Sequence, residues 1–251
     1  MKFVAISDVH IKKEGDKAEI LFHQFLKHPL TLSADIIFLL GDIFDLMVGG
    51  HKEYLQDFPK TFELLRSVLE TEKKIYYFEG NHDFHWESLF YYLRKEWNID
   101  SESFVYYKKP LEIDIDDKRI LFAHGDEIEL DNKPYQQYRK IIRSKLVDFL
   151  TNKIFSYKIV SGVGEKASKK SREINTERYA DKNTLLQKKF RKIFRDEKNK
   201  RGIDHLVCGH SHCLDLYEEA GFYSNNGFFP HTKTFTSYKD GKFSHVKLEI
   251  D

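Results

Sequence analysis

Five short apolar runs, each followed within three residues by Asp, His or Asn, constrain the fold of this chain more than any other feature. The runs are residues 2–6, 36–40, 75–78, 119–123 and 205–208. Short, continuously apolar runs are typical of strands that are buried on both faces. We therefore expect stacked sheets covered by helices, with polar side chains delivered where the strands end.

The segments around these runs indicate one domain. Helical periodicity occurs at residues 17–27 and 59–71, and residues 222–250 alternate around turn signals in a pattern that predicts closing antiparallel strands. The sequence contains no internal repeat and no linker rich in Pro or Gly. The chain of 251 residues is therefore expected to form a single domain over 1–251, of the α/β or α+β class.

The polar residues that follow the runs are suited to bind two metal ions. They are Asp8, His10, Asp42, Asn81, His124, His210 and His212. Two ions about 3.5–4 Å apart need one shared ligand, plus further N or O donors for each ion. Asp42 lies beside a turn glycine and is the expected bridge. We assign Asp8, His10 and His212 to one ion, and Asn81, His124 and His210 to the other.

The donor types bear on the identity of the metal. Imidazole and carboxylate ligands without a thiolate favour Mn²⁺, with Fe or Zn²⁺ as alternatives, over Ca²⁺. Cys208 and Cys213 flank the last motif and could supply zinc thiolates. However, Cys208 ends an apolar run, which favours a small packed side chain. Two cysteines are also too few for a disulfide framework.

Charge is distributed unevenly along the chain. Residues 133–201 contain 21 Lys and Arg and 7 Asp and Glu, a local net charge of +14, whereas the whole chain carries +1. Apolar residues at helical spacing from Tyr138 to Tyr157, with basic residues off that line, predict an amphipathic basic helix. A polar, basic helical stretch follows it. We interpret 133–201 as a basic helical lid inserted into the domain.

The motifs resemble those of the calcineurin-like metallophosphoesterases. They read Asp8-x-His10, Gly41-Asp42, Gly80-Asn81-His82-Asp83, His124-Gly125 and Gly209-His210-Ser211-His212. The resemblance implies a four-layered α/β/β/α sandwich, here with a helical lid, and a two-metal site at the strand ends. There the ions would activate a water that attacks phosphorus in line. Asp42 and His82 would be catalytic, with His82 orienting the phosphate or protonating the leaving oxygen.

A narrower resemblance is to the UDP-2,3-diacylglucosamine diphosphatases of lipid A synthesis. It rests on residues 41–45, 81–84, 124–126 and 131–135, and on Ser171-Arg172-Glu173-x-Asn175-x-x-Arg178 in the lid. It implies cleavage of a pyrophosphate to UMP and 2,3-diacylglucosamine 1-phosphate. The implied substrate contacts are Asn81, His82, Asn132, Tyr135, Ser171, Asn175, Arg178 and His210. His82 stands where that family commonly has Arg, and Asn132 where it has an acidic residue.

The resemblance makes a phosphorylated glycolipid the expected substrate, and the amphipathic basic helix makes an anionic membrane surface an expected partner. The apolar runs fall far short of the roughly 20 residues of a membrane-spanning helix. No signal peptide is visible at the start of the chain. We therefore expect a cytoplasmic protein that binds peripherally to the cytoplasmic face of the inner membrane.

Alternative interpretations remain open at this stage. The enzyme could act on another phosphomonoester or phosphodiester, in a nucleotide, a phosphoprotein or a nucleic acid. A non-catalytic binding module is disfavoured because no ligand is missing. The basic stretch could be a solvated face packed on the core, and nucleic acid is not an expected partner because no dedicated motif occurs. Phe84 and Trp86 could line a pocket or belong to the core.

Overall fold

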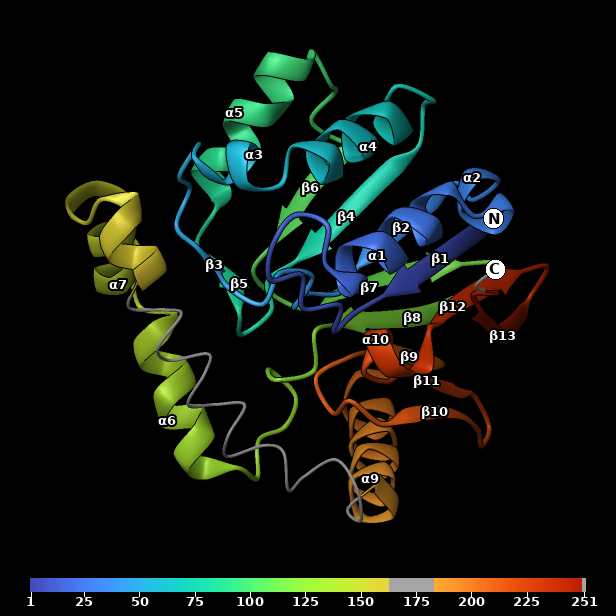
Figure 1. The fold of residues 1–251 in the computed structure, drawn as a ribbon. Helices are drawn as coiled ribbons and strands as arrows, with labels where there is room; N and C mark the ends of the chain where they lie inside the picture. Colours follow the sequence, from blue (N-terminus) through green and yellow to red (C-terminus); the bar gives the residue numbers. More distant parts are fainter. Residues whose placement is uncertain (163–182, 250–251) are drawn as a thin grey trace.

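Two sheets lie face to face in the computed structural model, which describes residues 1–162 and 183–249 (Figure 1). The larger sheet has six strands in the order β13-β12-β1-β2-β4-β6. They are β1 (Lys2–Ile6), β2 (Ile36–Leu39), β4 (Lys74–Phe78), β6 (Phe104–Tyr107), β12 (Thr234–Lys239) and β13 (Lys242–Lys247). Strands β1, β2, β4 and β6 pair in parallel, so their carboxyl ends meet at one edge.

The second sheet has five strands in the order β10-β11-β9-β8-β7. They are β7 (Leu111–Ile115), β8 (Lys118–Ala123), β9 (His205–Cys208), β10 (Leu214–Glu218) and β11 (Phe222–Asn226). Strands β8 and β9 are parallel neighbours, which brings the residues after each of them to the same edge. A short pair, β3 (Met47–Val48) and β5 (Asp83–Phe84), lies in the loops beyond β2 and β4.

A dry aromatic core holds the sheets together. The rings of Phe38 in β2 and Phe122 in β8 stack with centroids 3.8 Å apart, and Phe3 meets Phe122 edge-on at 5.2 Å. All three side chains are fully buried. Such ring pairs contribute about 0.5–1.5 kcal/mol each beyond the area that they bury. The apolar runs are thus continuous because each strand packs on a sheet on one side and on helices on the other.

Helices cover the outer face of the larger sheet. The main ones are α1 (Lys17–Lys27), α4 (Pro59–Leu69) and α5 (Glu87–Trp97), with the single turns α2 (Pro29–Leu32), α3 (Tyr54–Asp57) and α10 (Phe229–Thr232). Asp16 caps α1 by accepting a hydrogen bond from the Glu19 amide at 2.8 Å. Phe22 and Phe25 then bury the apolar face of α1 against the sheet.

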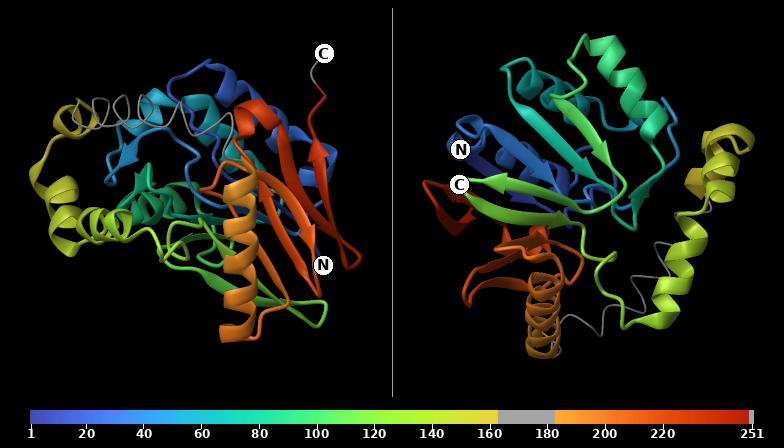
Figure 2. Two further views of the ribbon diagram at one scale, coloured as in Figure 1. Left: turned by 90° about the horizontal axis from the view of Figure 1, so that it is seen from below. Right: turned by 180° about the vertical axis from the view of Figure 1, so that it is seen from behind.

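Helix α9 (Asn183–Arg201) covers the outer face of the second sheet. Its Phe190 and Phe194 are 1% and 0% exposed and pack with Leu206 and Tyr223. Figure 2 shows α9 alongside the second sheet, on the side away from the larger sheet. The order of layers is therefore helix, sheet, sheet, helix, which confirms the expected sandwich. Residues 183–201 were expected to belong to the lid. In the structure their aromatic side chains instead make α9 one layer of the sandwich.

A helical arm formed by residues 133–162 projects from the sandwich (Figure 1). It contains α6 (Lys133–Ile142), α7 (Lys145–Phe149) and the π-helix η1 (Leu150–Ile154). The single helix predicted from Tyr138 to Tyr157 is broken because Ser144 starts a new helix, its hydroxyl accepting from the Val147 amide at 3.3 Å. Among the described residues, no helix has both the length and the apolar character needed to cross a membrane. Ser171, Asn175 and Arg178 lie outside the described residues.

Truncating the buried aromatic face of α9 tests its place in the sandwich. Phe194→Ala should lower the free energy of unfolding by about 3–5 kcal/mol, because it leaves a cavity against β9. Leu185→Ala on the same helix is the control, since Leu185 is 68% exposed, and it should change stability by less than about 0.5 kcal/mol. Urea denaturation of both variants measures the difference. Equal effects would contradict the packing described for α9.

Candidate metal centre

The predicted ligands follow neighbouring strand ends, and most of them sit in a strained backbone conformation. Positive φ angles between 53° and 66° occur at Asp8, His10, Asp42, His210 and His212. A residue other than glycine pays on the order of 1–3 kcal/mol for such a conformation. Strain of this kind persists where the surrounding structure enforces it, and it gathers at functional sites. The turns after β1, β2 and β9 are thus shaped to aim side chains rather than to minimise local energy.

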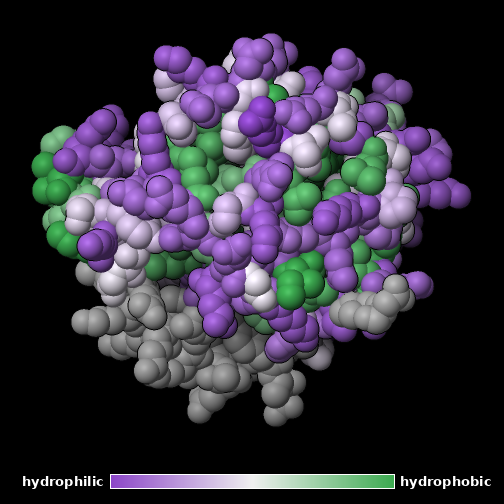
Figure 3. Space-filling view, turned by 45° about the horizontal axis from the view of Figure 1, so that its top comes forward, coloured by the Kyte–Doolittle hydropathy of each residue, from purple (hydrophilic) through white to green (hydrophobic). Residues whose placement is uncertain are grey.

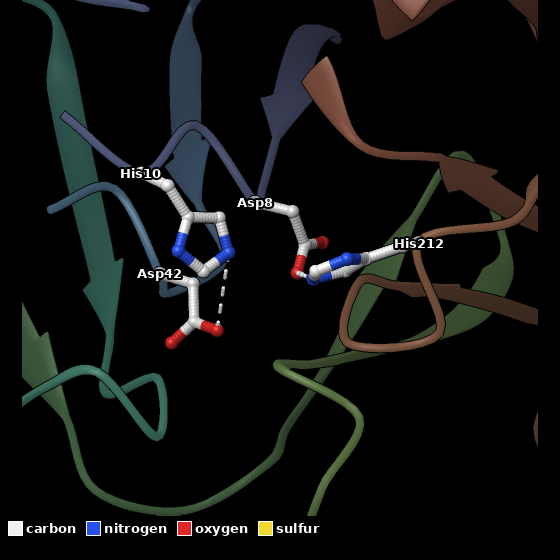
Figure 4. Close-up of side chains that lie close together, drawn as sticks. All are labelled: Asp8, His10, Asp42 and His212. Carbon is white, nitrogen blue, oxygen red and sulfur yellow. Dashed lines mark ion pairs between the residues drawn. The ribbon is translucent and has the colours of Figure 1, made fainter. Parts of the chain in front are cut away.

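Four of these side chains converge in a first cluster (Figure 4). One potential ligand atom from each of Asp8, His10, Asp42 and His212 lies within 4.8 Å of the others. His212 Nε2 is 3.0 Å from Asp8 Oδ1, and His10 Nε2 is 3.6 Å from Asp42 Oδ2. The structure therefore brings together the set predicted for the first ion, with the expected bridge.

The first cluster fits a cation. His10 Nε2 is fully buried and makes no hydrogen bond among the described residues, although it faces two carboxylates. An unsatisfied buried nitrogen is costly unless something else binds it. Burial on its own would raise the pKa of Asp8, but His212, His124 and His10 lower it well below its usual range. The pKa of Asp42 is lowered in the same way, so both carboxylates are ionised. Ionised carboxylates and an unpaired imidazole nitrogen suit a divalent metal ion.

The remaining predicted ligands form a second cluster around Asn81. Its Oδ1 lies 3.1 Å from both His124 Nε2 and His210 Nδ1. His124 Nε2 is also 3.6 Å from Asp42 Oδ2, the same oxygen that faces His10. One carboxylate oxygen of Asp42 is thus shared between the two clusters. This is the geometry that a bridging ligand between two ions requires.

Sequence comparison agrees with this geometry. A model of the family described as "Calcineurin-like phosphoesterase" matches residues 1–214 of the chain. The chain belongs to this family. It is therefore a phosphoesterase that depends on divalent metal ions, and the clusters at the strand ends are where such ions would bind.

Similar proteins carry a more specific name. The UDP-2,3-diacylglucosamine hydrolase of Haemophilus influenzae (strain PittGG) is 26% identical over 218 residues, which cover 86% of this chain and 85% of that protein. The protein of the same name from Psychromonas ingrahamii is 24% identical over 225 residues, covering 87% and 83%. Among solved structures, a novel archaeal phosphodiesterase is 12% identical with a TM-score of 0.48, and the match covers 99% of this chain and 100% of that one. The resemblance seen in the motifs is thus confirmed.

Three imidazoles at the clusters each have an acceptor near the ring nitrogen that faces away from the other ligand groups. His124 Nδ1 lies 2.8 Å from the Leu40 carbonyl, and His82 Nδ1 lies 2.8 Å from the Asp45 carbonyl. His10 Nδ1 lies 3.6 Å from the Asp45 carboxylate. Acceptors in these positions hold the proton on the outward nitrogen and leave the inward lone pair available to a metal ion.

Asp83 is a site residue to which the sequence analysis gave no role. Its buried carboxylate accepts hydrogen bonds from the amides of Asp42 at 2.8 Å and Gly80 at 2.9 Å, and from the Tyr77 hydroxyl. Gly80 has no room for a side chain, because a Cβ there would lie 2.1 Å from Asp42 Oδ1. Because the two segments approach so closely, the turn after β4 packs against the turn after β2, and Asn81 lies next to Asp42.

Asn226 supports Asp8 from the end of β11. The Ser7 hydroxyl donates to Asp8 Oδ2 at 2.5 Å, and Asn226 Oδ1 accepts from the Ser7 amide at 3.0 Å. An Asn-Gly pair in a sequence predicts only a turn and gives no signal for a contact 219 residues away. The Asn226 side chain is buried and positions the residue next to the first ligand.

Other residues singled out in the sequence fall near the centre or in the core. Tyr135 packs on His210 with ring centroids 5.3 Å apart, and Asn132 caps α6 by accepting from the Tyr135 amide at 3.4 Å. Trp86 is a core residue, and Phe84 packs beneath the arm with Val160.

The cysteines do not take part in the clusters. Burial raises the pKa of the Cys213 thiol to about 11 and that of Cys208 further still, so both are protonated. Neither belongs to a group of potential ligands among the described residues. The interpretation of Cys208 as a small packed side chain therefore fits the structure, and thiolate ligation of zinc does not.

Removing the shared carboxylate tests the two clusters together. Asp42→Ala should abolish phosphodiester hydrolysis and lower the amount of Mn²⁺ bound per chain, because both clusters lose the oxygen that faces them. Metal content after equilibrium dialysis and turnover of bis(p-nitrophenyl) phosphate measure the two effects. Asp215→Asn is a suitable control, since Asp215 is buried in β10 and pairs with Arg191 instead. A D42A protein that kept its metal content and its turnover would contradict the bridging assignment.

Proposed function

We propose that this phosphoesterase hydrolyses the pyrophosphate of UDP-2,3-diacylglucosamine, giving UMP and 2,3-diacylglucosamine 1-phosphate. The names of its relatives support this substrate. One observation in the structure carries the proposal: the helical arm is fixed directly beside the two clusters and turns apolar side chains outward. A substrate that combines a diphosphate with acyl chains needs both surfaces next to each other.

Two arginines fasten the arm to the centre. Arg143, at the end of α6, pairs with the buried Glu79 carboxylate and donates to the Gly80 carbonyl at 2.9 Å. Arg139 pairs with the buried carboxylate of Asp126 at 2.9 Å. Removing one partner of a buried pair is strongly destabilising, because it leaves an uncompensated charge. These pairs therefore hold the end of α6 in a fixed position beside Gly80, the residue before Asn81.

The outer surface of the arm is apolar and basic. Among the described residues, its exposed large hydrophobic side chains are Tyr138, Ile141, Leu146, Phe149, Ile154, Phe155 and Ile159. Figure 3 shows hydrophobic side chains gathered at the edge of the molecule over α7. Lys140, Lys145, Lys153 and Lys158 are exposed there and form no ion pair within the part of the chain that the structure describes. Such a surface suits acyl chains and an anionic membrane.

The residues of the two clusters would hold two divalent cations, for which we propose Mn²⁺. When bound, the cations would supply Lewis-acid charge that activates a water and neutralises phosphate oxygens. Asp8, His10 and His212 would hold one, and Asn81, His124 and His210 the other, with Asp42 shared. The chain itself orients these donors through Asp83 and Asn226, and it places them at the foot of the arm.

His82 is the proposed proton donor of the reaction. Its Nδ1 donates a hydrogen bond to the Asp45 carbonyl at 2.8 Å, which fixes the ring. The ring lies edge-on to His10 with centroids 4.8 Å apart, so it borders the first cluster. Protonation of the ring adds a second N–H, at Nε2, which can donate to a phosphate oxygen or to the leaving oxygen. We propose that His82 serves here in place of the Arg common among the diphosphatases.

A second candidate function follows from the same residue. Metallophosphoesterases of broader specificity carry His after the motif Asn, so His82 also fits an enzyme that cleaves other phosphomonoesters or phosphodiesters. The contacts expected from Ser171, Asn175 and Arg178 would favour the glycolipid, but these residues lie outside the described part of the chain. A direct comparison of substrates therefore decides between the two functions.

The substrate comparison uses purified protein with Mn²⁺. UDP-2,3-diacylglucosamine should be hydrolysed to UMP with a kcat/KM at least about 100-fold above that of bis(p-nitrophenyl) phosphate, a difference of roughly 2.7 kcal/mol in transition-state binding. Diadenosine nucleotides serve as the second comparison. Turnover of the generic substrates with none of the glycolipid would overturn the proposed substrate while leaving the two-metal site intact.

Binding to vesicles tests the arm. Leu146→Glu with Phe149→Glu should reduce sedimentation with vesicles of anionic phospholipid, because it replaces apolar contacts with negative charge. Ile20→Glu with Leu32→Glu is the matched control, since these residues are similarly exposed but lie on α1 and α2. The control should sediment as the unmodified chain does. Equal sedimentation of both double variants would argue against the arm as the membrane-binding surface.

A further inference from the structure

Glu129, in the loop after β8, lies behind one of the two imidazoles of the second cluster. Its Oε2 is 3.1 Å from His210 Nε2, while His210 Nδ1 faces Asn81 Oδ1 at 3.1 Å. The Glu129 side chain is only 8% exposed. The ring is thus held between an inward-facing ligand group and a buried carboxylate.

Lys189 of α9 holds this carboxylate in place. Its ammonium group pairs with Glu129 Oε1 and with Asp131 Oδ1, the latter at 3.0 Å. The two oxygens of Glu129 therefore have separate partners, one on α9 and one on the imidazole. From α6, Gln136 donates to the Glu129 carbonyl at 3.0 Å and to the Asp126 carbonyl at 2.7 Å, which fixes the backbone of the loop.

We infer that Glu129 is a positioning residue that keeps the proton of His210 on Nε2 and thereby leaves the Nδ1 lone pair for the second metal ion. A neutral imidazole carries one proton, and an anionic acceptor 3.1 Å from Nε2 favours the tautomer protonated there. Lys189 lies on α9, outside the motif loops, and supports this role by pairing with Glu129. The inference rests on the proposed two-ion site and not on the identity of the substrate.

The inference extends a pattern present elsewhere in the centre. His124 has the Leu40 carbonyl behind it and His10 has the Asp45 carboxylate. For His210, the acceptor in this place is Glu129, which carries a full negative charge. A charged acceptor orients a ring more strongly than a neutral one. Within the second cluster, His210 should therefore be more sensitive than His124 to losing its acceptor.

Two substitutions at Glu129 distinguish a role as hydrogen-bond acceptor from a role in packing alone. Glu129→Leu keeps comparable volume and removes the acceptor, so the second Mn²⁺ should bind about 10- to 100-fold more weakly in calorimetric titration of the metal-free protein. The first binding step should not change. Glu129→Gln retains an oxygen that can accept from Nε2, so it should lose less affinity. A loss in E129Q as large as that in E129L would overturn the assignment of Glu129 as the acceptor.

The tautomer of His210 gives a readout that does not depend on activity. Imidazole ¹⁵N shifts of metal-free protein should report the Nε2–H form in the unmodified chain and a substantial Nδ1–H population in E129L. Unchanged shifts in E129L would contradict the inference. Turnover should fall through kcat with little change in KM, because the substrate surface on the arm is untouched.

Asp215→Asn is the matched control for the contact with α9. It breaks the pair between Asp215 and Arg191, which joins α9 to β10 but does not reach the imidazole. D215N should therefore bind both ions normally even if it unfolds more easily, whereas Lys189→Met should weaken the second step to a smaller extent than E129L. If D215N weakened the second step as much as E129L, the effect would come from docking of α9, and the role of Glu129 would be overturned. One ion bound by the unmodified chain would instead contradict the two-ion site.

Discussion

The metal centre depends most on the hydrogen bonds that the carboxylate of Asp83 accepts. This carboxylate accepts hydrogen bonds from the amides of Asp42, Ile43, Phe44 and Gly80, and from the Tyr77 hydroxyl. A buried carboxylate is stable only where its lone pairs are satisfied. Here the donors come from the turn after β2 and from the region around the end of β4. One side chain thus sets the distance between Asp42 and Asn81, and the clusters are preorganised by hydrogen bonds within the chain.

In the folded structure, basic residues of one part of the sequence pair with acidic residues of the rest. Positive residues of 133–201 pair with acidic residues outside that segment: Arg139 with Asp126, Arg143 with Glu79, Lys189 with Glu129, Arg191 with Asp215, Arg195 with Glu219 and Arg201 with Glu112. This agrees in part with the interpretation of the basic stretch as a charged face packed on the core. The exposed pairs contribute little to stability, but those to Asp126 and Glu79 fix the arm. Within residues 1–162 and 183–249, Lys140, Lys145, Lys153 and Lys158 form no ion pair, so the exposed surface of the arm is both apolar and basic.

Sequence patterns were sufficient for several elements whose signal is local. Strands β1 and β9 and helix α1 begin and end at the predicted residues, because buried apolar runs and an Asp cap are read over a few positions. The two ligand clusters followed from the strand ends. Helix α9 falls within the predicted lid because Phe190 and Phe194 are surrounded by Lys and Arg in the sequence. This charged context obscures the pattern that would indicate a buried face. Contacts such as Glu129 with His210 join residues 81 apart, and no local pattern encodes them.

The centre is therefore supported from both sheets, from α9 and from the arm. The larger sheet supplies the Leu40 carbonyl behind His124, and the second sheet with α9 supplies Glu129 behind His210. The arm adds Arg143, which binds the Gly80 carbonyl next to Asn81. The same guanidinium pairs with the buried Glu79 carboxylate, so Arg143 is held between the arm and the turn after β4. The position of the arm and the position of Asn81 are thus fixed by one side chain.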